Sequence, residues 1–291
     1  RLAASEVARF GAQLRDEELG QTVGFKHALD KSVSDKTKIT YATEGYELAR
    51  QIYNPAKETD ALVRDESHER TAYSLLLEAY YRMREDEGYP IPLMLNMSAT
   101  LGVEKLRQYD SSIPVITIPG RQFEVKELEK GPSPAADVLR FLREGINPLS
   151  FHYGVKDIEE LIAEVKEKAP PGATIYPLHS KLTREQQQEA LAPREKKAIA
   201  ATNTAQTSLT VDADAVVITG KVRRLTLDDE GVPSLMIDDI SQDELKQQWG
   251  RTGRLAPGVF VSHAKPFDEL KPHAPSEIQN MPLETIILRL E

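Results

Sequence analysis

The sequence predicts an α/β protein with two domains, each built on a mostly parallel sheet with flanking helices. Two observations point to this fold class. Apolar runs of strand length alternate with segments of helical periodicity, which is the order that parallel strands joined by helices require. The chain also has 291 residues, which is enough for two domains at about 150 residues each.

The clearest strand candidates are apolar runs that end in glycine or in small polar residues. In chain order they are PIPLMLNMSAT (90–100), PVITIPG (114–120), NPLSFHYG (147–154), ATIYPLHS (173–180), KKAIAATN (196–203) and DAVVITG (214–220).

Helices are expected between the later runs. Asp157 is the expected N-cap of the first of them. The apolar face of that helix consists of Ile158, Leu161, Ile162 and Val165. Thr183 and Gln186 then have capping-box spacing, which predicts a helix that reaches about Ala192 and ends before Pro193.

The domain boundary is expected in the polar stretch KELEKGPSPAAD (126–137), because glycine and proline interrupt regular structure there. We therefore assign residues 1–128 to the first domain and 129–291 to the second. No repeat of fixed period and no low-complexity tract divides the chain further.

Composition and charge exclude several classes of protein. Hydrophobic residues make up 40% and charged residues 29% of the chain, as in soluble globular proteins. No apolar run approaches the ~18 residues of a membrane span, and no secretory signal or transit peptide is present, so we expect an intracellular protein, cytoplasmic or nuclear. The absence of cysteine excludes disulfides and thiolate chemistry. A net charge of -9 argues against coating of nucleic acid by bulk electrostatics, so any such contact must be local.

A dense cluster of charge lies in LVRDESHERT (62–71), where an apolar run leads into Asp65, Glu66 and His68. One interpretation is a solvated loop, as most charge clusters of this size are. The other is a metal-nucleotide site at the end of a buried strand, in which one carboxylate holds Mg²⁺ through water and the next activates a water molecule. The stretch alone does not decide between them.

A second unusual region lies in the C-terminal half. ATNTAQTSLTVD (201–212) carries five hydroxyl side chains, and QQWGRTGR (247–254) places Arg251 and Arg254 around two glycines. Each glycine costs roughly 1 kcal/mol of helix propensity, so an ordinary surface helix gains nothing from them. Arginines flanked by glycine suit close, bidentate contact with phosphate oxygens. The simpler alternative is a basic helix start with incidental glycines.

The order of these motifs resembles one family. RLAASEVA (1–8), ATEG (42–45), DESHERT (65–71), MSATL (97–101), IPGRQFEV (118–125) and the two motifs of the second half resemble the superfamily-2 helicases of the DEAH/RHA type. PLHSKLTREQQQ (177–188) and PSEIQNMPLETIILRL (275–290) resemble the sequence that connects and follows these motifs in the family, so the resemblance spans nearly the whole chain. It implies two RecA-like lobes, with a β-hairpin inserted in the second at 221–241.

The resemblance implies that ATP, or another nucleoside triphosphate, is hydrolysed with Mg²⁺. Asp65 and Glu66 match the Mg²⁺-binding acid and the base that activates water, and His68 matches the link to the second lobe. Gln247 matches the residue that helps to place the water, and Arg251 and Arg254 match the arginine fingers. The remaining residues that match nucleotide-contact or coupling positions are Ser98, Thr100, Thr207, Asp212 and Gly250.

The resemblance also implies single-stranded RNA as the partner, held through its backbone; DNA remains an alternative unless a 2′-hydroxyl contact is found. The implied contacts are Arg1, Thr43, Gly45, His179, Ser180, Thr202, Asn203 and Thr210. The expected hairpin is either a strand-parting device or a plain sheet-edge hairpin. A monomer is expected, and a protein activator is left open.

The chain departs from the family pattern at Ser67, Gln206 and Gly102, each of them a mild change, and in one more serious respect. Ser67 stands where the family usually has alanine, a small-for-small change. The phosphate-cradling loop G-x-x-x-x-G-K-[ST] does not occur in these residues. A first lobe without that loop and its strand and helix would expose apolar sheet to water. We expect a portion of a longer helicase, and the alternative is a non-catalytic relative that binds nucleic acid or acts as a scaffold.

Overall fold

The computed structural model describes residues 2–53, 59–99, 102–103, 107–108, 111–118, 120, 123–202, 213–227, 230 and 232–280. The chain divides into two compact units. The first unit comprises Arg1–Leu101 and Ser276–Glu291, and the second comprises Gly102–Pro275.

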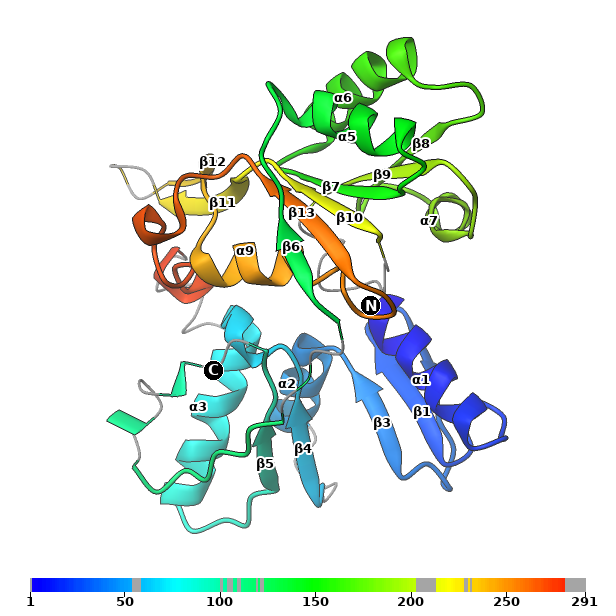
Figure 1. Cartoon of the computed structure of the whole chain (residues 1–291). Helices are drawn as coiled ribbons and strands as arrows, with labels where there is room; N and C mark the ends of the chain where they lie inside the picture. The colour runs from blue at the N-terminus through cyan, green and yellow to red at the C-terminus, as the bar shows by residue number, and fades with distance from the viewer. Residues whose placement is uncertain are drawn as a thin grey trace. The chain divides into compact units, whose positions relative to one another are not determined.

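The second unit is built on a six-stranded sheet in the order β6-β13-β10-β7-β9-β8 (Figure 1). All neighbouring strands in it are parallel. The strands are β6 (Val125–Glu127), β7 (Pro148–His152), β8 (Thr174–Leu178), β9 (Lys197–Thr202), β10 (Ala215–Ile218) and β13 (Gly258–Ser262). The central strands β7 and β10 are buried along their whole length, as expected for a parallel sheet covered on both faces.

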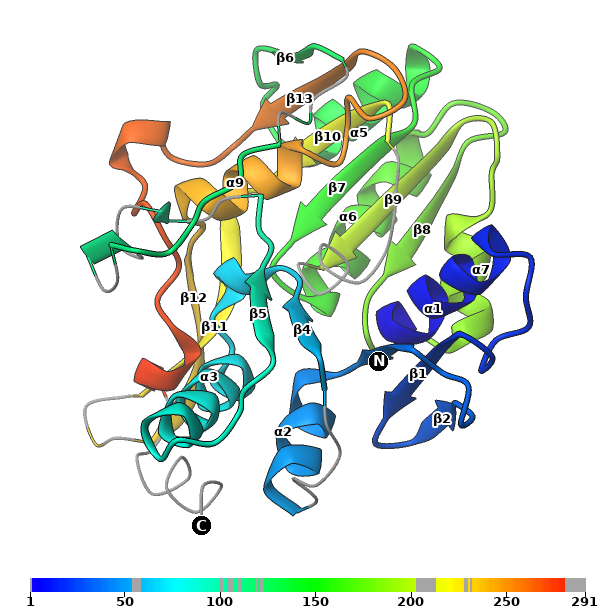
Figure 2. The same cartoon turned by 90° about the horizontal axis from the view of Figure 1, so that it is seen from below.

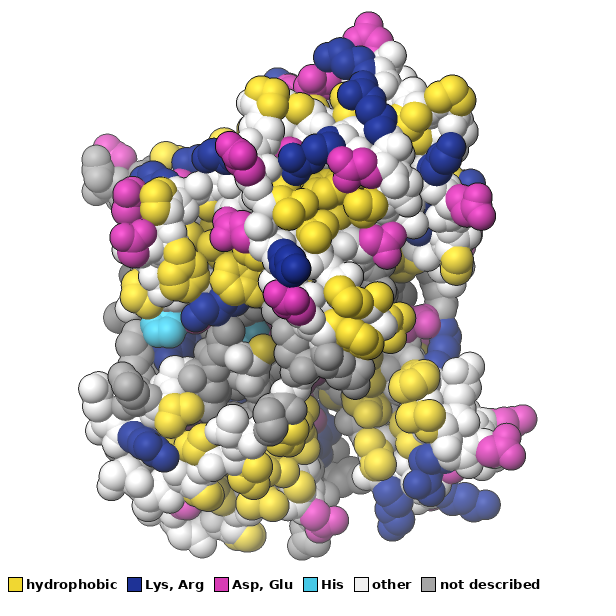
Figure 3. Space-filling model, viewed as in Figure 1, with side chains coloured by type: hydrophobic (Ala, Val, Ile, Leu, Met, Phe, Trp, Pro, Cys, Tyr) yellow, Lys and Arg dark blue, Asp and Glu magenta, His cyan; other side chains and the backbone are white. Residues whose placement is uncertain are grey.

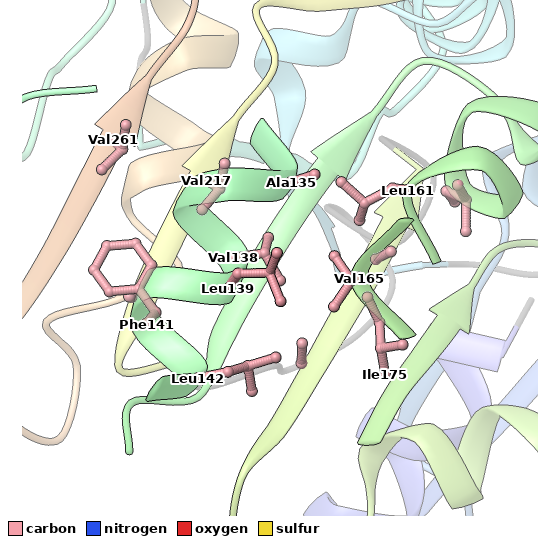
Figure 4. Packing of buried hydrophobic residues seen from close by; sticks show 14 residues of the cluster. Ala135, Val138, Leu139, Phe141, Leu142, Leu161, Val165, Ile175, Val217 and Val261 are labelled. Carbon is pink, nitrogen blue, oxygen red and sulfur yellow. The ribbon is translucent and has the colours of Figure 1, made fainter. Parts of the chain in front are cut away.

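Helices cover both faces of this sheet (Figure 2). They are α5 (Pro134–Arg143), α6 (Val155–Lys168), α7 (Arg184–Leu191) and α9 (Gln242–Trp249). Helices α5 and α6 pack on one face, where Figure 4 shows Val138, Leu139 and Leu142 of α5 among the buried side chains of that layer. Residues of α7 and α9 belong to the core on the other face. The predicted α/β fold with a parallel sheet and flanking helices is therefore confirmed in this unit.

The described part of the second unit also contains an antiparallel strand pair and a 3-10 turn. Strands β11 (Lys221–Leu227) and β12 (Pro233–Asp239) pair antiparallel, from Lys221 opposite Asp239 to Leu227 opposite Pro233. A 3-10 turn, η2, spans Phe267–Glu269.

The first unit contains two small sheets and three α-helices among its described residues (Figure 1). Its elements are α1 (Leu2–Leu14), β1 (Val23–His27), β2 (Asp30–Ser32), β3 (Ile39–Ala42), α2 (Glu44–Tyr53), β4 (Ala61–Arg64), η1 (Ser67–Glu69), α3 (Ala72–Asp86), β5 (Leu93–Asn96) and η3 (Glu277–Asn280). Strand β1 pairs parallel with β3 and antiparallel with β2, and β4 pairs parallel with β5.

Apolar side chains are exposed on the β4–β5 pair. Val63, Leu93 and Leu95 are 51%, 63% and 44% exposed, although parallel strands are normally covered on both faces. The other face of the pair is covered, since Leu62 and Met94 pack against the core made by α2 and α3. This exposure agrees with the expectation that apolar sheet in the first domain is open to water.

The division of the chain differs from the predicted boundary at 128. Strand β6 lies before that boundary, yet it pairs with β13 of the second unit, and Leu128 N–H donates to the Phe260 carbonyl at 2.8 Å. The residues from 276 onward belong to the first unit, and η3 contacts α3. Strand pairing and helix contact place these segments, whereas composition identifies only the polar stretch between them.

Two local predictions are wrong. No strand is formed by residues 114–118 of PVITIPG, and Ile116 and Ile118 are 84% and 83% exposed. Prolines at both ends of this run remove N–H donors that a sheet partner would need. Asp157 is not the N-cap of α6, because Gly154 occupies that position. The predicted capping box of Thr183 and Gln186 is confirmed at α7.

No helix in the described ranges is long and apolar enough to cross a membrane. On the face shown in Figure 3, lysine and arginine side chains are interspersed with aspartate and glutamate among the residues coloured by type. That face therefore carries both signs of charge.

Candidate active site

Asp65 and Glu66 lie immediately after β4, at the carboxyl end of the parallel β4–β5 pair. The Asp65 side chain is exposed, and its Oδ1 accepts a hydrogen bond from Glu66 N–H at 2.9 Å. Glu66 itself has φ 51° and ψ 36°, a left-handed conformation that costs a non-glycine residue roughly 1 kcal/mol or more. Such strain is concentrated at functional sites, where the surrounding structure holds it in place.

The turn after Glu66 is tied to the segment that follows β5. The Ser67 N–H and hydroxyl both donate to the Met97 carbonyl, at 3.0 and 3.1 Å. His68 Nδ1 lies 2.9 Å from Ser98 Oγ. Residues 97–98 therefore hold the turn formed by residues 65–70, which we call the acid turn. A displacement of residues 97–98 would move the acid turn as well.

His68 is the most buried titratable group of this turn, with a side chain that is 8% exposed. Its Nδ1 also lies 3.5 Å from Glu66 Oε2. Its Nε2 is buried and has no hydrogen-bond partner among the described residues. Buried polar atoms are normally paired, so this nitrogen is a candidate for contact with a group outside the described residues.

Thr43 and Gly45 lie at the start of α2, in the same unit as the acid turn. Thr43 N–H donates to the Lys26 carbonyl at 3.4 Å, which ties the loop after β3 to the end of β1. A Cβ on Gly45 would come within 3.3 Å of the Tyr73 ring. Glycine at this position therefore lets the start of α2 approach α3 closely.

The two arginines predicted to contact phosphate follow α9. A capping box of Ser241 and Glu244 opens this helix, and Gly250 is its C-cap, in ordinary right-handed conformation. Gln247 lies in the last turn, where its side chain is half-buried. Arg251 is half-buried and Arg254 is exposed, and Arg254 Nε donates to the Gly250 carbonyl at 3.3 Å. The motif therefore ends a helix, so the alternative of a basic helix start is wrong.

Gly253 has a structural requirement of its own. Its φ is +75°, and a Cβ there would lie 2.3 Å from Val125 Cγ2 on β6. Gly250 has neither a positive φ nor a contact this short. Gly253 thus lets the chain turn against β6 immediately before Arg254.

Gly253→Ala is expected to destabilise the protein more than Gly145→Ala. Gly145 has the same φ of +75° but no atom within 4 Å of a Cβ, so its substitution adds only strain of about 1–2 kcal/mol. At Gly253 the contact with Val125 should add about 1–3 kcal/mol of overpacking. Denaturant unfolding of both variants measures the difference, and equal destabilisation would contradict the packing role.

Three residues predicted to contact nucleic acid meet at the carboxyl edge of the second unit's sheet. His179 and Ser180 follow β8, and Thr202 ends the neighbouring strand β9. Ligands of open α/β sheets bind outside this edge. Ser180 is exposed and Thr202 is half-buried, so both hydroxyls lie where a polymer backbone could reach them.

Burial lowers the pKa of His179, with Glu159 opposing and Lys181 reinforcing the shift. Its Nδ1 is buried and has no partner among the described residues. The unfolded chain therefore binds the proton more tightly than the folded protein, so stability should fall as the pH is lowered through the ordinary value of 6.5 and level off below the folded pKa.

His179→Gln is expected to reduce this pH dependence. An NMR titration of the His179 ring protons measures the shift directly in the folded protein. A His179 midpoint at or above 6.5 would contradict the effect of burial.

The described residues fit a hydrated Mg²⁺ better than a fully protein-bound ion. No group of three or more metal-ligating side chains occurs among them, and the acid turn offers one exposed carboxylate with another beside it. Mg²⁺ is commonly held by one or two carboxylates together with water and phosphate oxygens. Asp65 and Glu66 suit that mode of binding.

Comparison with known proteins identifies helicases as similar to this chain. Residues 135–256 match the family model described as "Helicase conserved C-terminal domain". "ATP-dependent RNA helicase HrpB" of Escherichia coli (strain K12) is 31% identical over 285 residues, which cover 90% of this chain and 34% of that protein. "Probable ATP-dependent RNA helicase DHR2" of Saccharomyces cerevisiae is 29% identical over 286 residues, covering 89% of this chain and 38% of that protein.

Solved structures match over the whole chain. The crystal structure of E. coli DExH-box NTPase HrpB superposes with a TM-score of 0.81 at 27% identity, covering 100% of this chain and 38% of that one. A second crystal structure, of the Escherichia coli DEAH/RHA helicase HrpB, gives a TM-score of 0.83 at 27% identity, covering 100% and 39%. This chain is similar in sequence and in structure to DEAH/RHA-type helicases. It spans a little over a third of the length of the curated relatives.

Some residues that the helicase resemblance singles out lie outside the described residues. They are Arg1, Thr100, Asn203, Thr207, Thr210 and Asp212. Within each unit the structure brings several of the others together: Asp65, Glu66, His68 and Ser98 form one cluster, and Gln247, Gly250, Arg251 and Arg254 form another.

Sequence reasoning missed two features of this chain. Tyr153 and Gly154 follow β7 at the same sheet edge as His179, and Arg223 lies close to both. Arg64, just before the acid turn, is buried. The available signals were a glycine between a strand and a helix, and a charged residue ending an apolar run.

Proposed function

We propose that the intact protein is an RNA helicase or RNA–protein remodelling NTPase, in which hydrolysis of ATP or a related triphosphate drives movement along single-stranded RNA. The observation that carries the proposal is the hydrogen-bonded link between the acid turn and the segment after β5, through His68 and Ser98. A solvated surface loop has no need of a buried histidine or of a strained glutamate.

In this proposal each unit contributes one half of the NTPase site. In the first unit, Asp65 holds Mg²⁺ through water, and Glu66 accepts the proton of the attacking water. Bound Mg²⁺ supplies positive charge to the phosphate oxygens. In the second unit, Gln247 orients the water, and Arg251 and Arg254 neutralise charge that develops on the phosphate.

The RNA contacts are proposed on both units. Thr43 and Gly45 in the first unit, and His179, Ser180 and Thr202 in the second, offer hydroxyl, imidazole and backbone groups suited to phosphate and ribose. Such contacts hold the polymer without reading its bases, which a translocating motor requires. The antiparallel β11–β12 pair is the proposed strand-parting element.

The test is nucleotide turnover by the intact protein with and without single-stranded RNA, with single-stranded DNA of the same sequence as comparison. The proposal predicts turnover that RNA stimulates. Binding of RNA without any nucleotide turnover would favour the non-catalytic alternative, a nucleic-acid-binding or scaffolding protein. Equal stimulation by DNA would still support a translocating NTPase, but it would contradict RNA as the specific partner.

A further inference from the structure

Arg64 is a buried cation that directly precedes Asp65. Its side chain is only 7% exposed, on the face of the β4–β5 pair that α3 covers. A buried charge is costly unless it is paired and hydrogen-bonded. A leucine or methionine would fill such a position without that cost, as Leu62 and Met94 do on the same face. The charge at this position therefore calls for an explanation beyond packing.

The guanidinium group donates from all three of its nitrogens. Nε donates to Asn96 Oδ1 at 2.7 Å, Nη1 to the Ser74 carbonyl at 3.0 Å, and Nη2 to Glu78 Oε2 at 2.8 Å. Asn96 is the register partner of Arg64 on β5, and Ser74 and Glu78 lie one turn apart on α3. One side chain thus fixes the end of β5 and the first turns of α3 to the end of β4.

These elements bound the acid turn on both sides. The turn runs from β4 to the N-cap of α3, so its ends are separated by the distance that Arg64 sets between β4 and α3. Its middle is held by the segment after β5, whose Met97 N–H donates to the Arg64 carbonyl at 2.8 Å. Met97 and Ser98 in turn bond to Ser67 and His68.

The strained backbone of the acid turn explains why the hydrogen bonds of Arg64 are needed. Glu66 and Arg70 both have left-handed backbones, with φ of 51° and 47°. Non-glycine residues persist in that region only where the surroundings over-determine them. If α3 or β5 moved away from β4, the turn could relax to ordinary dihedral angles and Glu66 would point elsewhere.

We propose that Arg64 is a positioning residue for NTP hydrolysis: its three hydrogen bonds hold β4, β5 and α3 so that Asp65 and Glu66 keep their reactive placement. This inference rests on the proposed function. It requires the planar fork of arginine, because a lysine ammonium keeps the charge but cannot span three partners in the same geometry.

The test compares three variants of the intact protein. Arg64→Lys keeps the charge and loses the fork. Arg64→Leu/Glu78→Leu removes the ion pair together with both of its charges, a replacement that is often neutral for stability. Arg50→Lys is the matched control, because Arg50 is also a largely buried arginine of the first unit, paired with Glu47 on α2 and apart from the acid turn.

For both Arg64 variants we expect kcat of RNA-stimulated hydrolysis to fall by roughly 10- to 100-fold, with little change in KM for nucleotide and in melting temperature. Arg50→Lys should keep wild-type kcat. Wild-type kcat in the Arg64 variants, a parallel loss in the Arg50 control, or unfolding of both Arg64 variants would overturn the positioning role. Absence of turnover in the wild-type protein would overturn the proposed function, and the inference with it.

Discussion

Glu66→Gln is expected to lower kcat for RNA-stimulated hydrolysis by about 10²–10⁴-fold. The amide cannot accept the proton of the attacking water, whereas it preserves the size of the side chain. Binding of nucleotide should persist, since Asp65 and the groups that contact phosphate remain. Single-turnover kinetics with a fluorescent nucleotide separates the two effects.

Glu85→Gln is the matched control, because Glu85 is an exposed acid of the same unit, at the C-terminal end of α3. It should hydrolyse nucleotide at the wild-type rate. Unchanged turnover in Glu66→Gln would show that Glu66 is not the base in hydrolysis. It would also contradict the proposal that the acid turn is part of the NTPase site.

Arg254→Ala is expected to lower kcat by about 10³–10⁵-fold, the range of arginine fingers in related chemistry. The reason is that its guanidinium stabilises charge that appears only in the transition state, so KM for nucleotide should change far less than kcat. The measurement is steady-state hydrolysis at saturating RNA.

Arg143→Ala, at the exposed C-terminal end of α5, is the control for loss of one surface arginine from the second unit. It should leave kcat unchanged. A rise in KM at constant kcat for Arg254→Ala would show that Arg254 binds the ground state, which contradicts the role of a finger.

Local sequence patterns predicted those parts of the fold that depend on neighbours in the chain. The capping box of Thr183 and Gln186 was predictable because its two hydrogen bonds join residues three apart. The buried strands β7, β9 and β10 were predictable from their apolar runs. The strand predicted in PVITIPG is not formed by the described residues of that run. Whether a segment becomes a strand depends on a pairing partner elsewhere in the chain, which its own sequence does not identify.

The candidate site likewise has features that could be predicted from local sequence and features that depend on contacts between distant segments. The acid turn and the arginines after α9 were predicted from motif order, because these residues lie close together in the chain. The pairing of β6 with β13, which Gly253 packs against, joins segments more than 100 residues apart and has no local signal. The three bonds of Arg64 likewise depend on how α3 and β5 fold back. A charged residue in an apolar run was the one hint available.

We propose above that residues of both units act on one bound nucleotide. Residues 1–291 contain no cysteine, so fluorescent labels can be placed on cysteines introduced at Glu85 in the first unit and Lys168 in the second, both of which are exposed. Energy transfer between the labels is then measured with and without Mg²⁺ and nucleotide.

The comparison uses two backgrounds. In Glu66→Gln, nucleotide binds without hydrolysis, and its addition should change the transfer efficiency as the arginines of the second unit engage the nucleotide held by the first. In Arg251→Ala/Arg254→Ala, the same addition should leave the efficiency nearly unchanged. An equal change in both backgrounds, or no change in either, would contradict a site shared between the units.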